Sequence, residues 1–178
     1  MARITSLLFC LWFCIPTVGV AQHADVAAGE FAAGFFNRYE YTAMRYMRLA
    51  EALPAEVYSW SPGEGAMSVE KVYMHIIRYN YLYPEMLGIA VPAGIDMDQL
   101  ESMTGKDTVD QYLEDSLAYV RKMVRGSSEA DLQKMVNLYG NNTQAYNVYI
   151  QLQTHMSEHL GQLMAYARMN GITPPWSN

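Results

Sequence analysis

The chain has 178 residues, 51% of them hydrophobic, and carries 12 Lys or Arg residues against 18 Asp or Glu residues, a formal net charge of −6 at pH 7. This length suits one domain with a substantial core. An acidic chain without basic runs argues against nucleic acid as a partner, because phosphate contacts require clustered cations.

The first residues have the features of a secretory signal peptide. Arg3 provides a positive start, residues 4–20 are mostly apolar, and Gly19-Val20-Ala21 offers small residues where signal peptidase reads them. This pattern predicts cleavage after Ala21 and export to the periplasm or the exterior. A retained membrane anchor is the alternative, which the short and interrupted apolar run disfavours.

Cleavage would divide the chain into a signal peptide, residues 1–21, and a mature domain, residues 22–178. Both cysteines, Cys10 and Cys14, lie in the segment that is removed. The mature domain would therefore form no disulfide and bind no metal through thiolate. No second hydrophobic stretch is long enough to span a bilayer, so we expect no membrane association after cleavage.

Two helices are predicted in the first half of the mature domain. The first covers about residues 26–52 and ends before Pro54, with a start that neighbouring glycines leave open. The second begins after Ser68, a favourable N-cap. Pro84 is expected to end or kink it near Tyr83.

A long connection, residues 88–106, separates these helices from the next one. The third helix is predicted to begin at Thr108, where Thr-Val-Asp-Gln fits a capping box, and to end at Gly126. Ser128 is a candidate cap for a short helical turn.

The last part of the chain is predicted to hold another long helix, residues 144–169, after a loop at residues 137–142. No stretch alternates with period two for long enough to make a sheet. The four helical segments indicate an all-α domain.

Three of the four histidines carry most of the functional information. His155 and His159 stand four residues apart, so a helix brings both imidazoles to one face. His75 lies on the apolar stripe of an earlier helix. Two imidazoles at this spacing, joined by a third from a neighbouring helix, would give an ion three nitrogen ligands and leave a position open.

The alternative is that all three are core histidines, each bonded to a neighbour. The helix with His75 and the helix with His155 and His159 each have apolar residues at spacings of three and four around the histidines. Each helix therefore has an apolar stripe that is expected to point inward. Burying three unpaired imidazoles is costly, and one ion would satisfy all of them. The pattern therefore favours a metal site. The stripe residues are Val72, His75, Tyr79 and Leu82, and Ala145, Val148, Leu152, His155, His159, Leu163 and Tyr166.

Two parts of the sequence are similar to a known family. Residues 155–175 combine the paired histidines with Gly-Gln, Tyr-x-Arg and a Gly-x-x-Pro-Pro exit. Residues 52–75 combine Ala-Leu-Pro-Ala-Glu-Val-Tyr, a Trp, a Pro and Ser-Val leading to His75. Over residues 36–176 the chain resembles the DinB/YfiT-like superfamily of metal-binding four-helix bundles.

The resemblance implies an up-down four-helix bundle whose long crossover between helices 2 and 3 is residues 88–106. It also implies that His75, His155 and His159 are the metal ligands, and that the ion is one divalent transition metal, most often zinc or nickel. Known activities in the superfamily include thiol-dependent transferases and isomerases. Export would separate this chain from cytosolic thiols, which weakens the thiol-transferase interpretation.

Three functions stay open at this stage. The first is a metal-dependent enzyme, a water-activating hydrolase or a thiol-dependent transferase. The second is a metal-binding or small-molecule-binding bundle without catalysis. The third takes His155-x-x-Glu-His159 as an inverted zinc-protease motif with Glu158 as general base, although no acidic ligand follows it.

Gln162 and Tyr79 are candidates for outer contacts to the ion or its ligands, because each lies about one turn beyond a histidine. The sequence leaves open whether there is a substrate and whether two chains form a homodimer.

Overall fold

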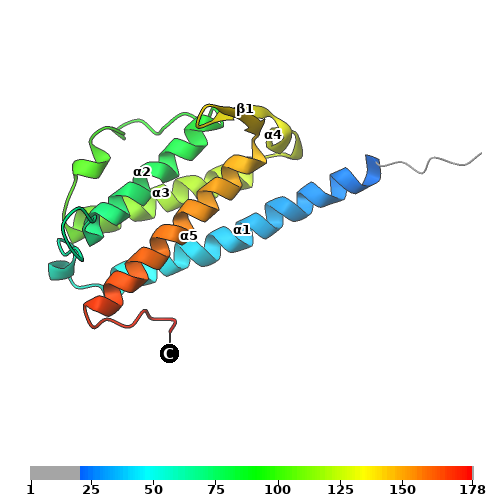
Figure 1. Ribbon diagram of the computed structural model, residues 1–178. Coiled ribbons are helices and arrows are strands. Elements are labelled where there is room, and N and C mark those ends of the chain that lie inside the picture. Colours follow the sequence, from blue (N-terminus) through cyan, green and yellow to red (C-terminus); the bar gives the residue numbers. More distant parts are fainter. Residues whose placement is uncertain (1–20, 178) are drawn as a thin grey trace, which may run out of the picture.

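Four long helices form a bundle in the computed structural model, which describes residues 21–177 (Figure 1). They are α1 (Ala21–Ala52), α2 (Val69–Met86), α3 (Lys106–Gly126) and α5 (Tyr146–Met169). The predicted all-α, up-down four-helix bundle is confirmed. The proposed signal peptide, except for its last residue, lies outside the described residues.

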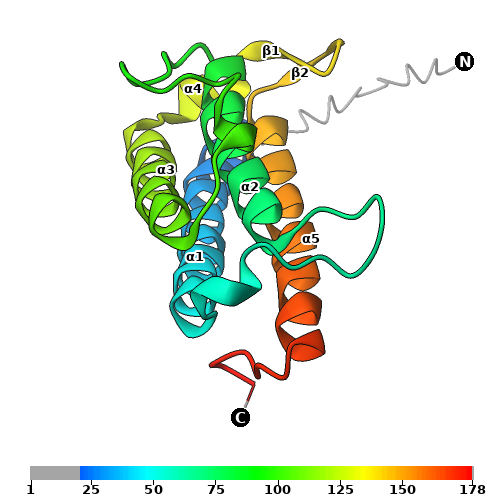
Figure 2. The same cartoon turned by 90° about the vertical axis from the view of Figure 1, so that its left-hand side faces the viewer.

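The helices pack as a ring, α2 against α3 and α5, and α1 against α3 and α5 (Figure 2). Their shared core is rich in tyrosine, and a buried phenol needs a hydrogen-bond partner. Tyr39 on α1 donates to the carbonyl of Leu117 on α3 at 2.6 Å. Tyr46 donates to the carbonyl of Met156 on α5 at 2.7 Å. These bonds connect α1 to both neighbours across the core.

The crossover between α2 and α3 runs along the outer side of α2 (Figure 2). It contains one 3₁₀ turn, η2 (Leu100–Ser102), and the side chain of Leu100 is fully buried. Arg78 on α2 donates from Nε to the carbonyl of Met97 at 3.2 Å. The crossover is therefore packed and bonded onto α2, and its predicted place between helices 2 and 3 is confirmed.

The structure differs from the predicted boundaries of α2 and α3. Helix α2 continues through Pro84 to Met86, because the proline lies in the last turn and its missing N–H removes only one backbone bond. Helix α3 begins two residues before Thr108, with no capping box there. Its N-cap is Gly105, whose φ of 92° suits glycine, and Glu70 Oε2 accepts from the N–H of Gly105 at 2.9 Å.

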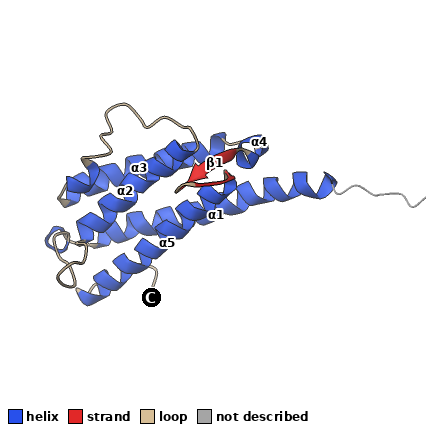
Figure 3. Cartoon of the chain, turned by 45° about the horizontal axis from the view of Figure 1, so that its top comes forward, coloured by secondary structure: helices blue, strands red, loops and turns tan. Residues whose placement is uncertain are grey.

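The segment between α3 and α5 contains a hairpin that the sequence did not predict. After the short helix α4 (Glu129–Gln133), which Ser128 caps as expected, β1 (Met135–Leu138) pairs antiparallel with β2 (Asn141–Gln144) (Figure 3). The turn residues Tyr139 and Gly140 both have positive φ, 52° and 88°. Because Gln144 pairs in the hairpin, α5 starts two residues later than predicted.

No helix within residues 21–177 has the combination of length and apolar character required to cross a bilayer.

Candidate metal centre

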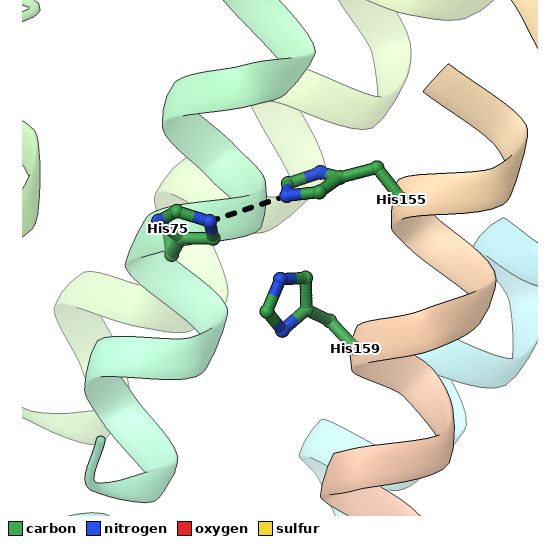
Figure 4. A group of neighbouring side chains, drawn as sticks. All are labelled: His75, His155 and His159. Carbon is green, nitrogen blue, oxygen red and sulfur yellow. Dashed lines mark hydrogen bonds between the residues drawn. The ribbon is translucent and has the colours of Figure 1, made fainter. Parts of the chain in front are cut away.

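Helices α2 and α5 bring the three predicted histidines together (Figure 4). His75 comes from α2, and His155 and His159 from successive turns of α5. One ring nitrogen from each lies within 4.8 Å of the other two. The Nε2 atoms of His75 and His155 are 3.2 Å apart. The arrangement has the convergence that a shared ion requires.

The rings pack against each other on the inner face of the two helices. Their centroids are 5.1 Å apart for His75 and His155, 4.9 Å for His75 and His159, and 4.6 Å for His155 and His159. His155 is the most buried, with 9% of its surface exposed, and the other two are half-buried. The cluster therefore lies at the edge of the core, with one side toward solvent.

Burial keeps the two α5 histidines neutral. Burial, with the neighbouring imidazoles adding to it, lowers the pKa of His155 to about 3. Burial also lowers the pKa of His159, although the hydrogen bond to Gln162 opposes the shift. Neutral imidazole is the form that binds metal, so the electrostatics of the cluster suit a cation rather than additional protons.

The donor set fits one divalent transition metal ion. Two nitrogens that each lie about 2.0–2.1 Å from a tetrahedral zinc ion are roughly 3.3 Å apart. The Nε2 atoms of His75 and His155 already have nearly this separation, at 3.2 Å. Imidazole ligands accept zinc, nickel and several other ions, so the geometry does not select one metal.

Two of the histidines have hydrogen-bond partners for the ring nitrogen that faces away from the cluster. His75 Nδ1 lies 2.9 Å from Glu101 Oε1 in the crossover. His159 Nδ1 lies 2.8 Å from Gln162 Oε1, and Gln162 Nε2 donates to the hydroxyl of Tyr166 at 2.8 Å. Such partners fix the tautomer that leaves Nε2 free to bind metal.

The third histidine lacks such a partner among the described residues. His155 Nδ1 is buried without a hydrogen bond. Its ring is instead held by aromatic packing, with centroid distances of 4.3 Å to Tyr79 and 5.9 Å to Tyr83. The orientation of His155 therefore depends on shape rather than on a hydrogen bond.

Tyrosines form one wall beside the cluster. The ring of Tyr79 contacts both His75 and His155, at centroid distances of 4.6 and 4.3 Å. The hydroxyls of Tyr83 and Tyr139 are 2.8 Å apart, which connects the hairpin turn to this wall. Tyr79 thus lies next to the cluster as a packing residue, and Gln162 as a hydrogen-bond partner of His159.

Sequence reasoning missed Glu101 and the contribution of the hairpin. Glu101 follows His75 by 26 residues, and no spacing rule connects a crossover residue to a helix. Glu158, the base of the protease interpretation, is exposed on the outer side of α5. The group of converging ligand atoms within residues 21–177 contains no carboxylate, and Glu101 bonds the other ring nitrogen of His75, so the motif lacks its acidic ligand.

Known proteins with a similar sequence or structure have the same helical fold. The model of a family described as the DinB family matches residues 29–178. A DinB-like protein from Bacillus cereus superposes with a TM-score of 0.71 and 18% identity, covering 82% of this chain and 97% of its own. A DinB-like protein from Bacillus subtilis gives a TM-score of 0.61 and 19% identity, covering 81% and 93%.

A mycothiol-dependent maleylpyruvate isomerase has the same fold, with a TM-score of 0.60 and 16% identity. The match covers 74% of this chain and 60% of the isomerase, so the isomerase has further structure without a counterpart here. No curated protein matches the sequence.

Proposed function

The chain belongs to the DinB family, and on that premise we propose that it binds one divalent transition metal ion through His75, His155 and His159. The observation that carries the proposal is the 3.2 Å separation of the Nε2 atoms of His75 and His155, with His159 completing the group. Zinc and nickel are the ions we propose, because both accept imidazole ligands.

The alternative to a metal site is a cluster of core histidines that are hydrogen-bonded to each other. A single hydrogen bond between His75 and His155 would satisfy one pair of nitrogens and would leave His159 out of the group. An ion would use one lone pair from every ring. Elemental analysis of the protein purified from its own host tests the choice, with one equivalent of a transition metal expected per chain. Absence of metal there, and no zinc uptake afterwards, would refute the proposal.

We propose in addition that the chain is exported, so that the site acts in the periplasm or outside the cell as the mature domain 22–178. The support is the sequence of residues 1–21, a charged start, an apolar run and a small-residue cleavage site. Mass spectrometry of the protein from its host should give a chain that starts at Gln22. A product that retains Cys10 and Cys14 would contradict export by cleavage.

A metal-dependent enzyme is the second candidate function. Three neutral ligands leave the ion most of its charge, which supplies Lewis acidity toward a bound water or a substrate oxygen. Two observations favour this candidate, the partial exposure of His75 and Glu101, 22% and 47% of their side chains, and the shared fold with an isomerase. The cluster is therefore not closed off from solvent on the side of His75.

Hydrolysis and thiol chemistry can be separated by experiment. The metal-loaded protein is offered a panel of esters, amides and phosphoesters, and separately glutathione, bacillithiol or mycothiol with an electrophile. We expect no thiol conjugation, because an exported protein is separated from these thiols. Conjugation that requires both metal and His155 would refute that expectation. Turnover in neither panel would favour a binding protein.

A further inference from the structure

A carboxylate from the crossover contacts the histidine cluster on the outward side of His75. Glu101 Oε1 lies 2.9 Å from His75 Nδ1, the ring nitrogen that faces away from His155 and His159. The side chain of His75 is 22% exposed and that of Glu101 is 47% exposed. A partly exposed contact of this kind contributes little to stability by itself, so the relevant question is how the carboxylate affects the His75 ring.

The backbone around Glu101 is held in place. Leu100, the preceding residue, is fully buried. Arg78 donates to the carbonyl of Met97 at 3.2 Å, and the N–H of Gly105 donates to Glu70 at 2.9 Å. The crossover is thus bonded to α2 on both sides of Glu101, which presents its carboxylate to His75 from a fixed position.

The chemistry of the pair selects one tautomer of His75. A neutral imidazole has one N–H, and a carboxylate can only accept, so Nδ1 must carry the proton. The lone pair then lies on Nε2, the atom that is 3.2 Å from Nε2 of His155. The carboxylate also makes the ring a stronger electron donor, as outer partners of metal-bound histidines do.

We propose that Glu101 is a positioning residue that fixes the tautomer and orientation of His75 and so strengthens metal binding. This inference rests on the proposed metal-binding function. Glu101 acts through His75 and is not itself a ligand, because its carboxylate bonds the ring nitrogen on the far side of the cluster. The crossover, rather than the two ligand-bearing helices alone, then determines the affinity of the site.

Zinc titration of the purified protein tests the role. Glu101→Ala should weaken zinc binding about 10–100-fold, the usual effect of losing an outer partner of a ligand. Glu101→Gln keeps an acceptor oxygen and should retain more of the affinity than Glu101→Ala. Asp98→Ala is the matched control, since it removes an exposed carboxylate from the same crossover and should leave zinc binding unchanged. Circular dichroism verifies that each variant is folded.

A second readout does not depend on metal. The ¹⁵N shifts of the imidazole nitrogens in the metal-free protein, assigned with a His75→Ala variant, should show Nδ1 of His75 protonated in the wild type. In Glu101→Ala the shifts should move toward a mixture of tautomers. In Asp98→Ala they should not move.

The experiments distinguish a failure of the proposed metal site from a failure of the proposed role of Glu101. A wild-type protein that takes up no zinc would refute the metal site, while the ¹⁵N shifts would still decide the role of Glu101. Zinc affinity in Glu101→Ala equal to that of the wild type or of Asp98→Ala would overturn the proposal. So would equal losses in Glu101→Ala and Glu101→Gln, because an acceptor oxygen would then be irrelevant.

Discussion

Each histidine of the cluster is expected to make a separate contribution to metal binding. Replacing His75, His155 or His159 by Ala removes one of three nitrogens, and two ligands seldom hold an ion well. Losing an outer partner of a ligand costs about 10–100-fold in affinity, so we expect the loss of a ligand to cost more, as measured by competition with a chromophoric chelator. His23→Ala is the matched control, because His23 belongs to neither apolar stripe and should be dispensable. Metal loss in the control with retention in His75→Ala would refute the assignment.

Gln162 is expected to affect the site through His159. Its Oε1 accepts from His159 Nδ1, and its Nε2 is held by the hydroxyl of Tyr166. Gln162→Leu should reduce zinc affinity about 10-fold or more, and Tyr166→Phe should have a smaller effect because the amide oxygen stays. Isothermal titration calorimetry measures both. Gln111→Leu, the same change on α3, should have no effect, and a loss there as large as in Gln162→Leu would contradict this role.

Gln162 and Glu101, the hydrogen-bond partners of His159 and His75, show how far residue spacing can predict a site. Gln162 was a candidate from the sequence because it follows His159 by three residues on one helix. Glu101 was not, because it reaches His75 only after the chain has left α2 and returned along it. Helix geometry is fixed by hydrogen bonds within the segment, whereas the path of a crossover depends on packing such as that of Leu100. Contacts within a helix are thus predictable where contacts across a loop are not.

At the scale of helices, one ion pair joins α1 to α3. Arg121 donates from Nε and Nη2 to the two carboxylate oxygens of Glu40, at 2.6 and 2.9 Å. The hydrogen bond from Arg121 lowers the pKa of Glu40 below its ordinary 4.5. A lowered pKa in the folded state means that this contribution to stability is present above pH 4.5 and is lost as the pH falls through the folded value.

Glu40→Gln should therefore lower the free energy of unfolding by about 0.2–1 kcal/mol at pH 7, the range for exposed pairs. The difference from the wild type should shrink in urea titrations below pH 4.5. Glu114→Gln, an exposed residue of α3, provides the control and should change stability little at any pH. A deficit in Glu40→Gln that stays constant down to acidic pH would show that the charge of Glu40 is not its source.

The wrong element boundaries have local causes. The turn of the hairpin has Tyr139 rather than Asn or Asp before Gly140, so the usual two-residue signal is absent. Its second strand, Asn141–Gln144, is entirely polar and shows no alternation. At the start of α3, the N-cap is Gly105, which has no side chain to cap the helix, and Glu70 from α2 accepts from its N–H. The contact between Glu70 and Gly105 joins residues 35 positions apart, which a pattern read along the chain cannot include.

Across the whole molecule, the bundle was predictable because caps and helix-breaking residues divide the chain into four helical segments, and because α2 and α5 carry apolar stripes. The stripe of α5 also fixed the direction of two histidines, and that of α2 fixed the third. The stripes could not predict the angle between α2 and α5. They therefore could not predict that Nε2 of His75 lies 3.2 Å from Nε2 of His155. The distance depends on packing of tyrosines such as Tyr79 between the helices. The three histidines therefore come together only when the core is assembled.

An ion shared by α2 and α5 should stabilise the whole bundle. A ligand that binds only the folded chain adds about 2.7 kcal/mol at a concentration 100 times its dissociation constant. We expect zinc to raise Tm by several degrees at pH 7 and a chelator to reverse the change, as followed by circular dichroism. His155→Ala should abolish the response.

Acid should remove this stabilisation. Imidazoles bind metal only when neutral, so protons compete with the ion as the pH falls. The pKa of His155 is lowered to about 3 in the folded chain, whereas in the unfolded chain it is near the ordinary 6.5. Below pH 6.5 the unfolded state therefore takes up a proton that the folded state resists, which destabilises the metal-free fold as well. The Tm should fall between pH 6.5 and pH 3 with or without zinc, and the difference that zinc makes should vanish at the acid end. A zinc effect on Tm that persists at pH 3 would show that the ion is held by groups other than these histidines.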